Sequence, residues 1–526
     1  KRKINIVTTN VAAALDRCNI SDRKGAFIIS ACAKALGCTL DDISISRSTI
    51  KRQREKARTE SSVLIKQNFK PDEWLVVHWD GKILPETSGT SIHVDKLAIT
   101  VSGANSDKLL GIISLERSTG EAQADAVIGM LKKWNLESRI IAMSFDTTAA
   151  NTGPYNGACV LIESQLKSDL LYLACRHHMY ELVLRSIFEA SIKTPVNGPN
   201  VGLYKRFQQS WSNIDTMAFE TGISEINIAS VLSNSKDDII AFCIDQLKKT
   251  QPREDYREFL ELVIIFLGGI PSRGILFRAP GAVHDARWMS KALYSLKIYM
   301  YKSQFQLTPQ ELSGLRDVCI FIVQLFVKAW FTAPNHDLQF LKSLIRFENI
   351  NKKAAQAAVK KFTGHLWYLN EELVGLAFFD STVSSDTKEK MVAALKSRNA
   401  SHNDLKRPHI KDVERWSSVN LENLVSSKTF QFFNRFHINV DFLSIHPSLW
   451  ECNNSFKHGK ETVVNLKVIN DVAERAVALA QCFNGTLTKN YEQKQHLFQV
   501  VTEHRRSMRQ CTKNTLNVDF KYTIGN

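Results

Sequence analysis

The sequence predicts an α/β core with a mixed five-stranded sheet, interrupted by a large all-α insertion and preceded by a basic helical region. Five short, apolar, β-prone runs fall within residues 71–195. Helical periodicity then continues from 196 to 455 with almost no strand-like alternation. Residues 1–70 combine helical patterns with 15 Lys and Arg against 6 Asp and Glu. These observations predict four regions, at 1–70, 71–195, 196–455 and 456–526.

The N-terminal region, 1–70, predicts three helices. Two cover Asn10–Asp16 and Asp22–Leu36, and Gly37 ends the second. The third starts near Ser46 and carries a basic series that includes Lys51, Arg52 and Arg54. A short helix, a turn and a basic third helix predict a helix-turn-helix that places the third helix against DNA. A solvated basic helix is the alternative.

The strands and helices of the core follow in a definite order. The five strand-like runs are Trp74–Asp80, Lys96–Ser102, Leu109–Leu115, Arg139–Asp146 and Leu170–Ala174. One helix is expected from about Gly120 to Trp134 and another through Cys159–Ile162. This β-β-β-α-β-α-β order is the RNase H arrangement, in which the first and fourth strands lie side by side. The sequence therefore predicts an RNase H-like core.

Two of these runs end in aspartate, at Asp80 and Asp146, and turn-forming residues follow each at once. A single aspartate after a strand is usually a helix N-cap or a turn residue. The pairing of the first and fourth strands favours a shared site instead, because open α/β sheets bind ligands at the carboxyl ends of their strands. Carboxylate oxygens are apt ligands for Mg²⁺, so this pair predicts a metal site.

A third acid, Glu474, lies on an apolar helical stretch far downstream. Asp80 and Asp146 are 66 residues apart (146 minus 80), and Asp146 and Glu474 are 328 apart (474 minus 146). A helical insertion between the last strand and the final core helices explains this spacing. Asp471 and Glu461 are the rival acids for the third position.

Four motifs in sequence order resemble those of the hAT superfamily of DNA transposases. They are Asp146-Thr-Thr-Ala-Ala-Asn151, Cys175-Arg-His-His178, His284-Asp-Ala-Arg287-Trp288 and Glu474-Arg475. The resemblance covers roughly residues 70 to 490. It departs from the family around the Glu-Arg pair, where Ala473 precedes and Ala476-Val477 follow, and residues 1–70 hold no Cys/His zinc finger.

The resemblance implies a cut-and-paste DNA transposase that cleaves and joins DNA by two-metal-ion chemistry, with hairpin formation on flanking DNA. Asp80, Asp146 and Glu474 are then the catalytic acids and the ligands of Mg²⁺, for which Mn²⁺ substitutes. The partners are transposon ends and target DNA, the assembly is a homo-oligomer, either a dimer or larger, and the location is the nucleus. A domesticated DNA-binding protein without cleavage activity and an RNase H-like nuclease are the alternatives.

The resemblance also implies roles for residues outside the acids. His178 points toward the scissile phosphate, with His177 as the alternative, and Cys175 packs at a strand-to-helix junction. Trp288, with Arg287 beside it, stacks on a base flipped out next to the cut. No second Cys/His pair accompanies Cys175 and His178, so a structural zinc is not favoured.

Composition agrees with a nucleic-acid partner. The 526-residue chain has a formal net charge of +15 and a pI of about 9.2, which favours polyanionic partners. No apolar stretch reaches 18 residues, so no membrane span is expected. The ten cysteines have no Cys-x-x-Cys pair or regular spacing, which excludes a disulfide scaffold.

Overall fold

The computed structural model describes residues 4–85, 93–104, 106–193, 201–281, 289–332, 337–401, 406–408 and 415–508. The chain divides into two compact units, Lys1–Leu173 with Asn470–Asn526, and Ala174–Ile469. The Arg287-Trp288 motif lies outside the described residues. No helix in the described part of the chain is long and apolar enough to cross a membrane.

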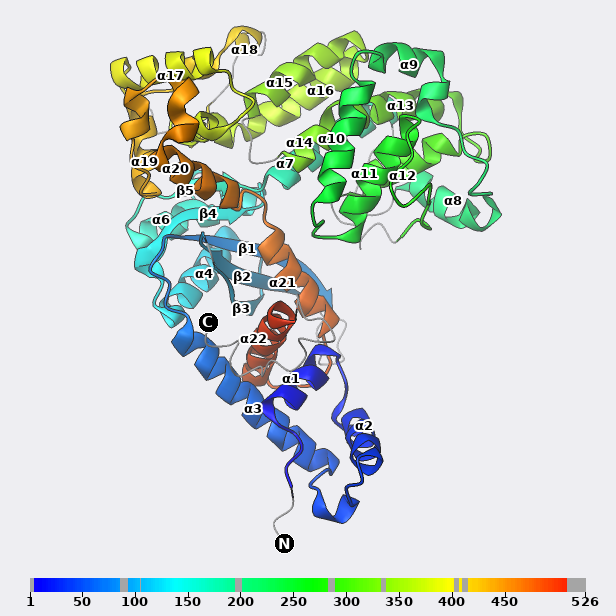
Figure 1. Cartoon of the computed structure of the whole chain (residues 1–526), viewed down its shortest axis with the longest axis vertical. Coiled ribbons are helices and arrows are strands. Elements are labelled where there is room, and N and C mark those ends of the chain that lie inside the picture. The colour runs from blue at the N-terminus through cyan, green and yellow to red at the C-terminus, as the bar shows by residue number, and fades with distance from the viewer. Residues whose placement is uncertain are drawn as a thin grey trace. The chain divides into compact units, whose positions relative to one another are not determined.

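The first unit is built on a mixed five-stranded sheet with the order β3-β2-β1-β4-β5 (Figure 1). Its strands are β1 Leu75–Pro85, β2 His93–Ser102, β3 Asp107–Leu115, β4 Ile140–Phe145 and β5 Leu171–Ala174. β2 pairs with β1 and β3 in antiparallel fashion, and β1 pairs with β4 in parallel. The predicted strand count and the pairing of the first and fourth strands are therefore confirmed.

The first strand is longer than its sequence predicts. β1 continues through Gly81 and Lys82, which the sequence suggests are a turn, and Asp80 lies inside the strand. The reason is a second partner: the ladder to β4 stops at His78, whereas the antiparallel ladder to β2 continues to Pro85. Asp80 consequently lies where β1 extends beyond its parallel neighbour, and the expectation that it ends the strand is wrong.

Helices cover both faces of the sheet. The α-helices that follow or flank the strands are α4 Gly120–Trp134, α5 Ala149–Thr152, α6 Ala158–Leu166, α21 Asp471–Cys482 and α22 Tyr491–Ser507. α4 contacts β3 and α6, and its Trp134 indole donates to the Leu110 carbonyl. α21 and α22 bury Val477, Leu479 and Leu497 in one cluster with Ala98 and Ile112 of the sheet. Residues on β1 alternate between the two faces, so Trp79 and Asp80 point to opposite sides.

The N-terminal region joins this unit through its three predicted helices. They are α1 Thr9–Arg17, α2 Asp22–Ala35 and α3 Arg47–Asn68, and Ser46 caps the third by accepting from the Thr49 amide. α3 packs along α22, where the Ser62 hydroxyl bonds to the Gln499 side chain. All three predicted helices are confirmed, and the capping hydroxyl explains where the last one begins.

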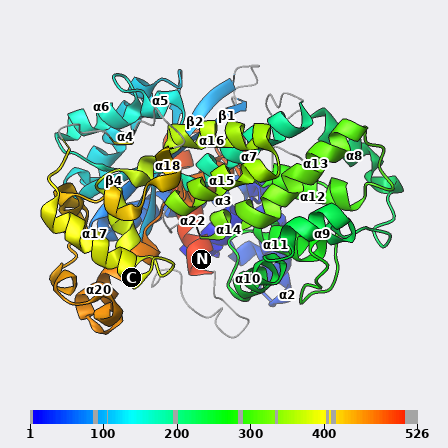
Figure 2. The same ribbon diagram turned by 90° about the horizontal axis from the view of Figure 1, so that it is seen from above.

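The second unit contains only helices in its described residues, apart from the end of β5. Its α-helices are α7 Arg176–Ile192, α8 Gly202–Ser210, α9 Ile226–Leu232, α10 Lys236–Lys248, α11 Glu254–Phe266, α12 Ser290–Met300, α13 Pro309–Phe321, α14 Val327–Phe331, α15 Asp337–Arg346, α16 Lys352–Phe362, α17 Ser385–Ser397, α18 Arg415–Ser418, α19 Phe430–Arg435 and α20 Asn454–Asn465. Within this unit, α8 to α13 form one group and α17, α19 and α20 another (Figures 1 and 2). The predicted helical character of this stretch is confirmed for the residues described.

Candidate active site

Asp80 on β1 and Asp146, the first residue after β4, each lie just beyond the last pair of the β1–β4 ladder. The ladder pairs His78 with Ser144, and each aspartate follows its member of this pair by two positions. Because side chains alternate along a strand, a separation of two keeps Asp80 on the face that His78 occupies. Asp80 is 4% exposed, so its carboxylate is buried next to the point where β4 ends.

Asp146 is held by a local turn directly after β4. Its Oδ1 accepts from the Thr148 amide at 3.2 Å, the Thr148 hydroxyl at 2.7 Å and the Asn151 amide Nδ2 at 2.6 Å. This turn bonds a side chain to backbone two residues ahead, which is what short polar residues favour after a strand. All the hydrogen bonds recorded for this carboxylate go to Oδ1, so Oδ2 accepts none from the described residues.

Asn151 connects this turn to β1. Its side chain lies buried, donates to Asp146 and accepts from the Trp79 indole at 2.9 Å. Trp79 in turn stacks on Phe145, with the ring centroids 5.6 Å apart. One amide therefore links the turn that holds Asp146 to the residue before Asp80 on β1.

Helix α21 crosses the face of the sheet on which Asp80 lies. The Asn470 amide, just before the helix, donates to the Trp79 carbonyl at 2.8 Å. Near the other end, Lys82 donates to the Gln481 side chain at 2.7 Å. These two bonds bracket Asp80 on the strand and Glu474 on the helix. Glu474 lies in the first turn of α21 and is half-buried.

The rival acids occupy different positions. Asp471 begins α21 and belongs to the same unit as Asp80, whereas Glu461 lies on α20 of the second unit and is exposed. Glu474 follows Asn470 by one helical turn, and its amide donates to the Asn470 carbonyl at 3.1 Å. Asn470, whose side chain bonds α21 to β1, therefore lies one helical turn before Glu474.

The donor chemistry of these residues fits a hard cation, but no preformed cage is present. Carboxylate oxygens are the ligands that Mg²⁺ prefers. In the described part of the chain, however, no three His, Cys, Asp or Glu side chains are grouped closely enough to hold a metal ion. Neighbouring carboxylates repel one another without a cation between them. The arrangement therefore offers two aspartates near the end of the β1–β4 ladder and a glutamate on the covering helix, and the described residues do not gather three ligands.

The Cys-Arg-His-His motif lies in the second unit, at the start of α7. Cys175 is buried and forms the N-cap of that helix, directly after β5. His177 is buried too: its ring stacks on Trp330 with centroids 3.6 Å apart, and its Nδ1 bonds to the Tyr256 hydroxyl at 3.2 Å. His178 is the partly exposed histidine of the pair.

The basic residues expected to contact DNA from α3 divide into two kinds. Lys51 and Arg52 are exposed, and Lys51 is 3.9 Å from Glu55 on its own helix. Arg54 is 1% exposed and donates to the Asp16 and Asp22 carboxylates. The Arg54 guanidinium is enclosed and paired inside the N-terminal region, so Lys51 and Arg52 are the members of this set that the fold leaves exposed for DNA.

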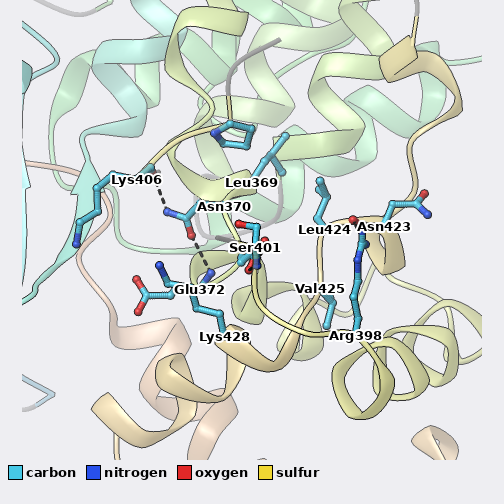
Figure 3. Close-up of a pocket in the computed structure, with 12 residues that line it drawn as sticks. Leu369, Asn370, Glu372, Arg398, Ser401, Lys406, Asn423, Leu424, Val425 and Lys428 are labelled. Carbon is cyan, nitrogen blue, oxygen red and sulfur yellow. Dashed lines mark hydrogen bonds between the residues drawn. The ribbon is translucent and has the colours of Figure 1, made fainter. Parts of the chain in front are cut away.

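A polar pocket of about 240 Å³ lies in the second unit and was not predicted from the sequence (Figure 3). Two of its polar side chains are bonded to backbone atoms of the surrounding loops. The Asn370 amide donates to the Lys406 carbonyl, and its Oδ1 accepts from the amides of Glu372 and Leu373. Arg398 donates to the Asn423 carbonyl. These bonds tie loops together, so the pocket is explained as a structural junction.

The sequence matches no known protein-family model, and no curated protein matches it. The resemblance to hAT transposases therefore depends on the short motifs and on the order of the core elements.

Proposed function

We propose that this protein is a DNA-cleaving enzyme with an RNase H-like core, a transposase of the hAT type. The observation that carries the proposal is that Asp80 and Asp146 each follow the last pair of the parallel β1–β4 ladder, His78 and Ser144, by two residues. The order of strands and helices supports an RNase H-like assignment for the sheet. The covering helix with Glu474 supports a third acid on the same face.

The chemistry follows from the acids. Cleavage of a phosphodiester needs a water or 3′-hydroxyl that has lost its proton and a leaving oxygen whose negative charge is stabilised. Mg²⁺ or Mn²⁺ supplies both effects as a Lewis acid when it is bound. Asp80, Asp146 and Glu474 are the proposed ligands. The turn around Asn151 holds Asp146 through Oδ1, and no described residue donates to Oδ2, which is the oxygen proposed to bind the metal.

The basic surface supports a nucleic-acid substrate. The formal net charge of +15 favours binding to a polyanion, and Lys51 and Arg52 are exposed on α3. Transposon ends and target DNA are the proposed partners, with a dimer or larger assembly and a nuclear location. His178, Arg287 and Trp288 are proposed to contact the strand near the cut.

The test compares Asp80→Asn, Asp146→Asn and Glu474→Gln with the wild type on duplex DNA taken from the borders of the encoding locus. Each variant is expected to lose cleavage in Mg²⁺ and in Mn²⁺ and to keep DNA binding. Asp95→Asn is the matched control, because Asp95 pairs across the ladder with Ile83, on the opposite face from Asp80. A single variant that cuts as well as the wild type would remove its residue from the site.

A DNA-binding protein without cleavage activity is the second candidate. The absence of three grouped metal ligands in the described residues favours it. Specific binding to the same border DNA, with no nicks in either metal, is its signature. A strand-transfer assay separates the third candidate, an RNase H-like nuclease, which cuts without joining.

A further inference from the structure

A second pocket, of about 430 Å³, lies in the first unit on the same face of the sheet as Asp80. β2, β3, α21 and α22 all contribute to its walls. Thr100 lines it, and this residue pairs with His78 across the ladder, two positions from the Asp80–Ala98 pair. The volume lies within the range of about 300–1,000 Å³ that small-molecule sites occupy. None of the roles proposed above uses this pocket.

The rim of the pocket is positively charged. Four cations, Lys108, Arg475, Arg505 and Arg506, line it together with two carboxylates. Lys108 pairs with Glu503 at 2.7 Å, and Arg506 approaches Asp107 at 3.4 Å.

Two of these cations remain for a ligand. Arg475 is exposed and has no ion pair or hydrogen bond within the described residues, and Arg505 is exposed with its guanidinium 5.9 Å from the Phe483 ring. Both lie at the mouth of a pocket whose other charges are balanced. An anionic group is therefore the natural occupant of the rim.

The interior of the pocket is apolar except for one hydroxyl. Leu109, Val472 and Leu479 line it, and Thr100 is 1% exposed. The Thr100 Oγ1 atom has no hydrogen-bond partner in the described part of the chain. Buried hydroxyls are normally bonded, so an unpaired one in a pocket wall indicates a missing polar partner.

We infer that this pocket binds one unpaired nucleotide, with its phosphate on Arg475 and Arg505 and its base between the apolar side chains. A base is flat, largely apolar on its faces and polar at its edge, and that edge supplies a partner for Thr100. Arg475 is the residue after Glu474 on α21, so this helix supplies one side chain to the pocket and one to the set of candidate acids, none of which lines the pocket. The inference uses the proposed function only to name a nucleic-acid strand as the source of the nucleotide.

The test measures binding by the full chain, in EDTA so that no strand is cut. The probes are a blunt duplex, the same duplex with one unpaired nucleotide at its 5′ end, and free mononucleotides. The wild type is expected to prefer the unpaired end by roughly tenfold, the value of one hydrogen bond to a charged group. If millimolar mononucleotide competes with the unpaired-end duplex, a free nucleotide also enters the pocket. If it does not compete, the nucleotide binds only as part of a strand.

The variants are Arg475→Ala, Thr100→Val and Thr100→Ser. The first two are expected to lose the preference, while Thr100→Ser keeps it because it retains the hydroxyl. Arg475→Ala is also expected to lower the slope of log affinity against log salt by about 0.7, the effect of one phosphate contact on a single strand. Lys132→Ala is the matched control, since Lys132 is exposed on α4, which covers the opposite face.

Loss of blunt-duplex binding in the same proportion, or an unchanged preference in both Arg475→Ala and Thr100→Val, would overturn the inference. Failure of the proposed function is distinct. If the protein prefers the unpaired end but never cuts DNA in Mg²⁺, the nucleotide pocket is supported and the proposed nuclease activity is contradicted. If it cuts DNA but shows no such preference, only the nucleotide pocket is contradicted.

Discussion

Replacing Arg54 with alanine tests the division of α3 into a buried and an exposed basic face. Arg54 donates to the Asp16 carboxylate from Nε at 3.0 Å, to the Ile20 carbonyl at 2.8 Å and to Asp22 at 2.7 Å. Asp16 is fully buried and, among the described residues, keeps Arg58 as its side-chain partner in the variant. Breaking a buried ion pair by removing one partner costs about 3–5 kcal/mol, and because Arg58 remains we expect the lower end of this range.

The loss of stability in Arg54→Ala is expected to be confined to α1–α3, so amide hydrogen exchange is the suitable assay. A cost of about 3 kcal/mol raises amide exchange in these helices by on the order of a hundredfold. Arg52→Ala is the matched control, because it removes the same charge from an exposed position on the same helix. Exposed substitutions change stability by less than about 0.5 kcal/mol. Arg52→Ala is therefore expected to leave exchange unchanged and to weaken DNA binding.

The opposite pattern would refute this reasoning. If Arg54→Ala exchanges like the wild type and weakens DNA binding as much as Arg52→Ala does, the guanidinium is available to DNA. The enclosed position of Arg54 and its pairing with Asp16 would then not describe the protein in solution.

Three further predictions concern other parts of the chain. Asn151→Ala is expected to lower the rate of DNA cleavage about 10–100-fold and to leave DNA binding unchanged, because the Asn151 amide positions Asp146 in the proposed site. Equal losses of cleavage and of DNA binding would show that Asn151 serves folding alone. His177→Ala is expected to lower the melting temperature of the protein through the lost ring stack, whereas His178→Ala leaves it within a degree or two; similar shifts would contradict this. Burial, with nearby positive charge, lowers the pKa of His365 to about 3, so the unfolded chain binds more protons there below pH 6.5. The free energy of unfolding is accordingly expected to fall as the pH drops from 6.5 toward 3, more steeply in the wild type than in His365→Gln. Urea-unfolding midpoints that change equally with pH in the two proteins would exclude this effect.

The sequence predicted the core elements well because their signals are local. Apolar runs such as Leu109–Leu115 and the capping hydroxyl at Ser46 mark a strand and a helix start without knowledge of distant residues. The length of β1 was missed because residues 81–85 gain their partner from β2, which is a tertiary effect. Gly81 and Lys82 look like a turn in isolation and are strand residues only in the hairpin.

The candidate site depends more on long-range contacts. The pairing of β1 with β4 followed from the predicted strand order, but the burial of Arg54 depends on Asp16, which lies 38 residues away. A basic helix gives no local sign of which charges will be enclosed. The pocket beside Thr100 was also invisible in the sequence, because four separate elements build it.

The central claim is that Asp80, Asp146 and Glu474 form one divalent-cation site, and metal-directed cleavage of the chain tests it most directly. Fe²⁺ replaces Mg²⁺, ascorbate and peroxide generate radicals at the ion, and the cut positions are identified by mass spectrometry. We expect cuts close to residues 80, 146 and 474, all suppressed by excess Mg²⁺ and all weakened in Asp146→Asn. Cuts near 80 and 146 without any near 474, or cuts that Mg²⁺ does not suppress, would contradict a shared site.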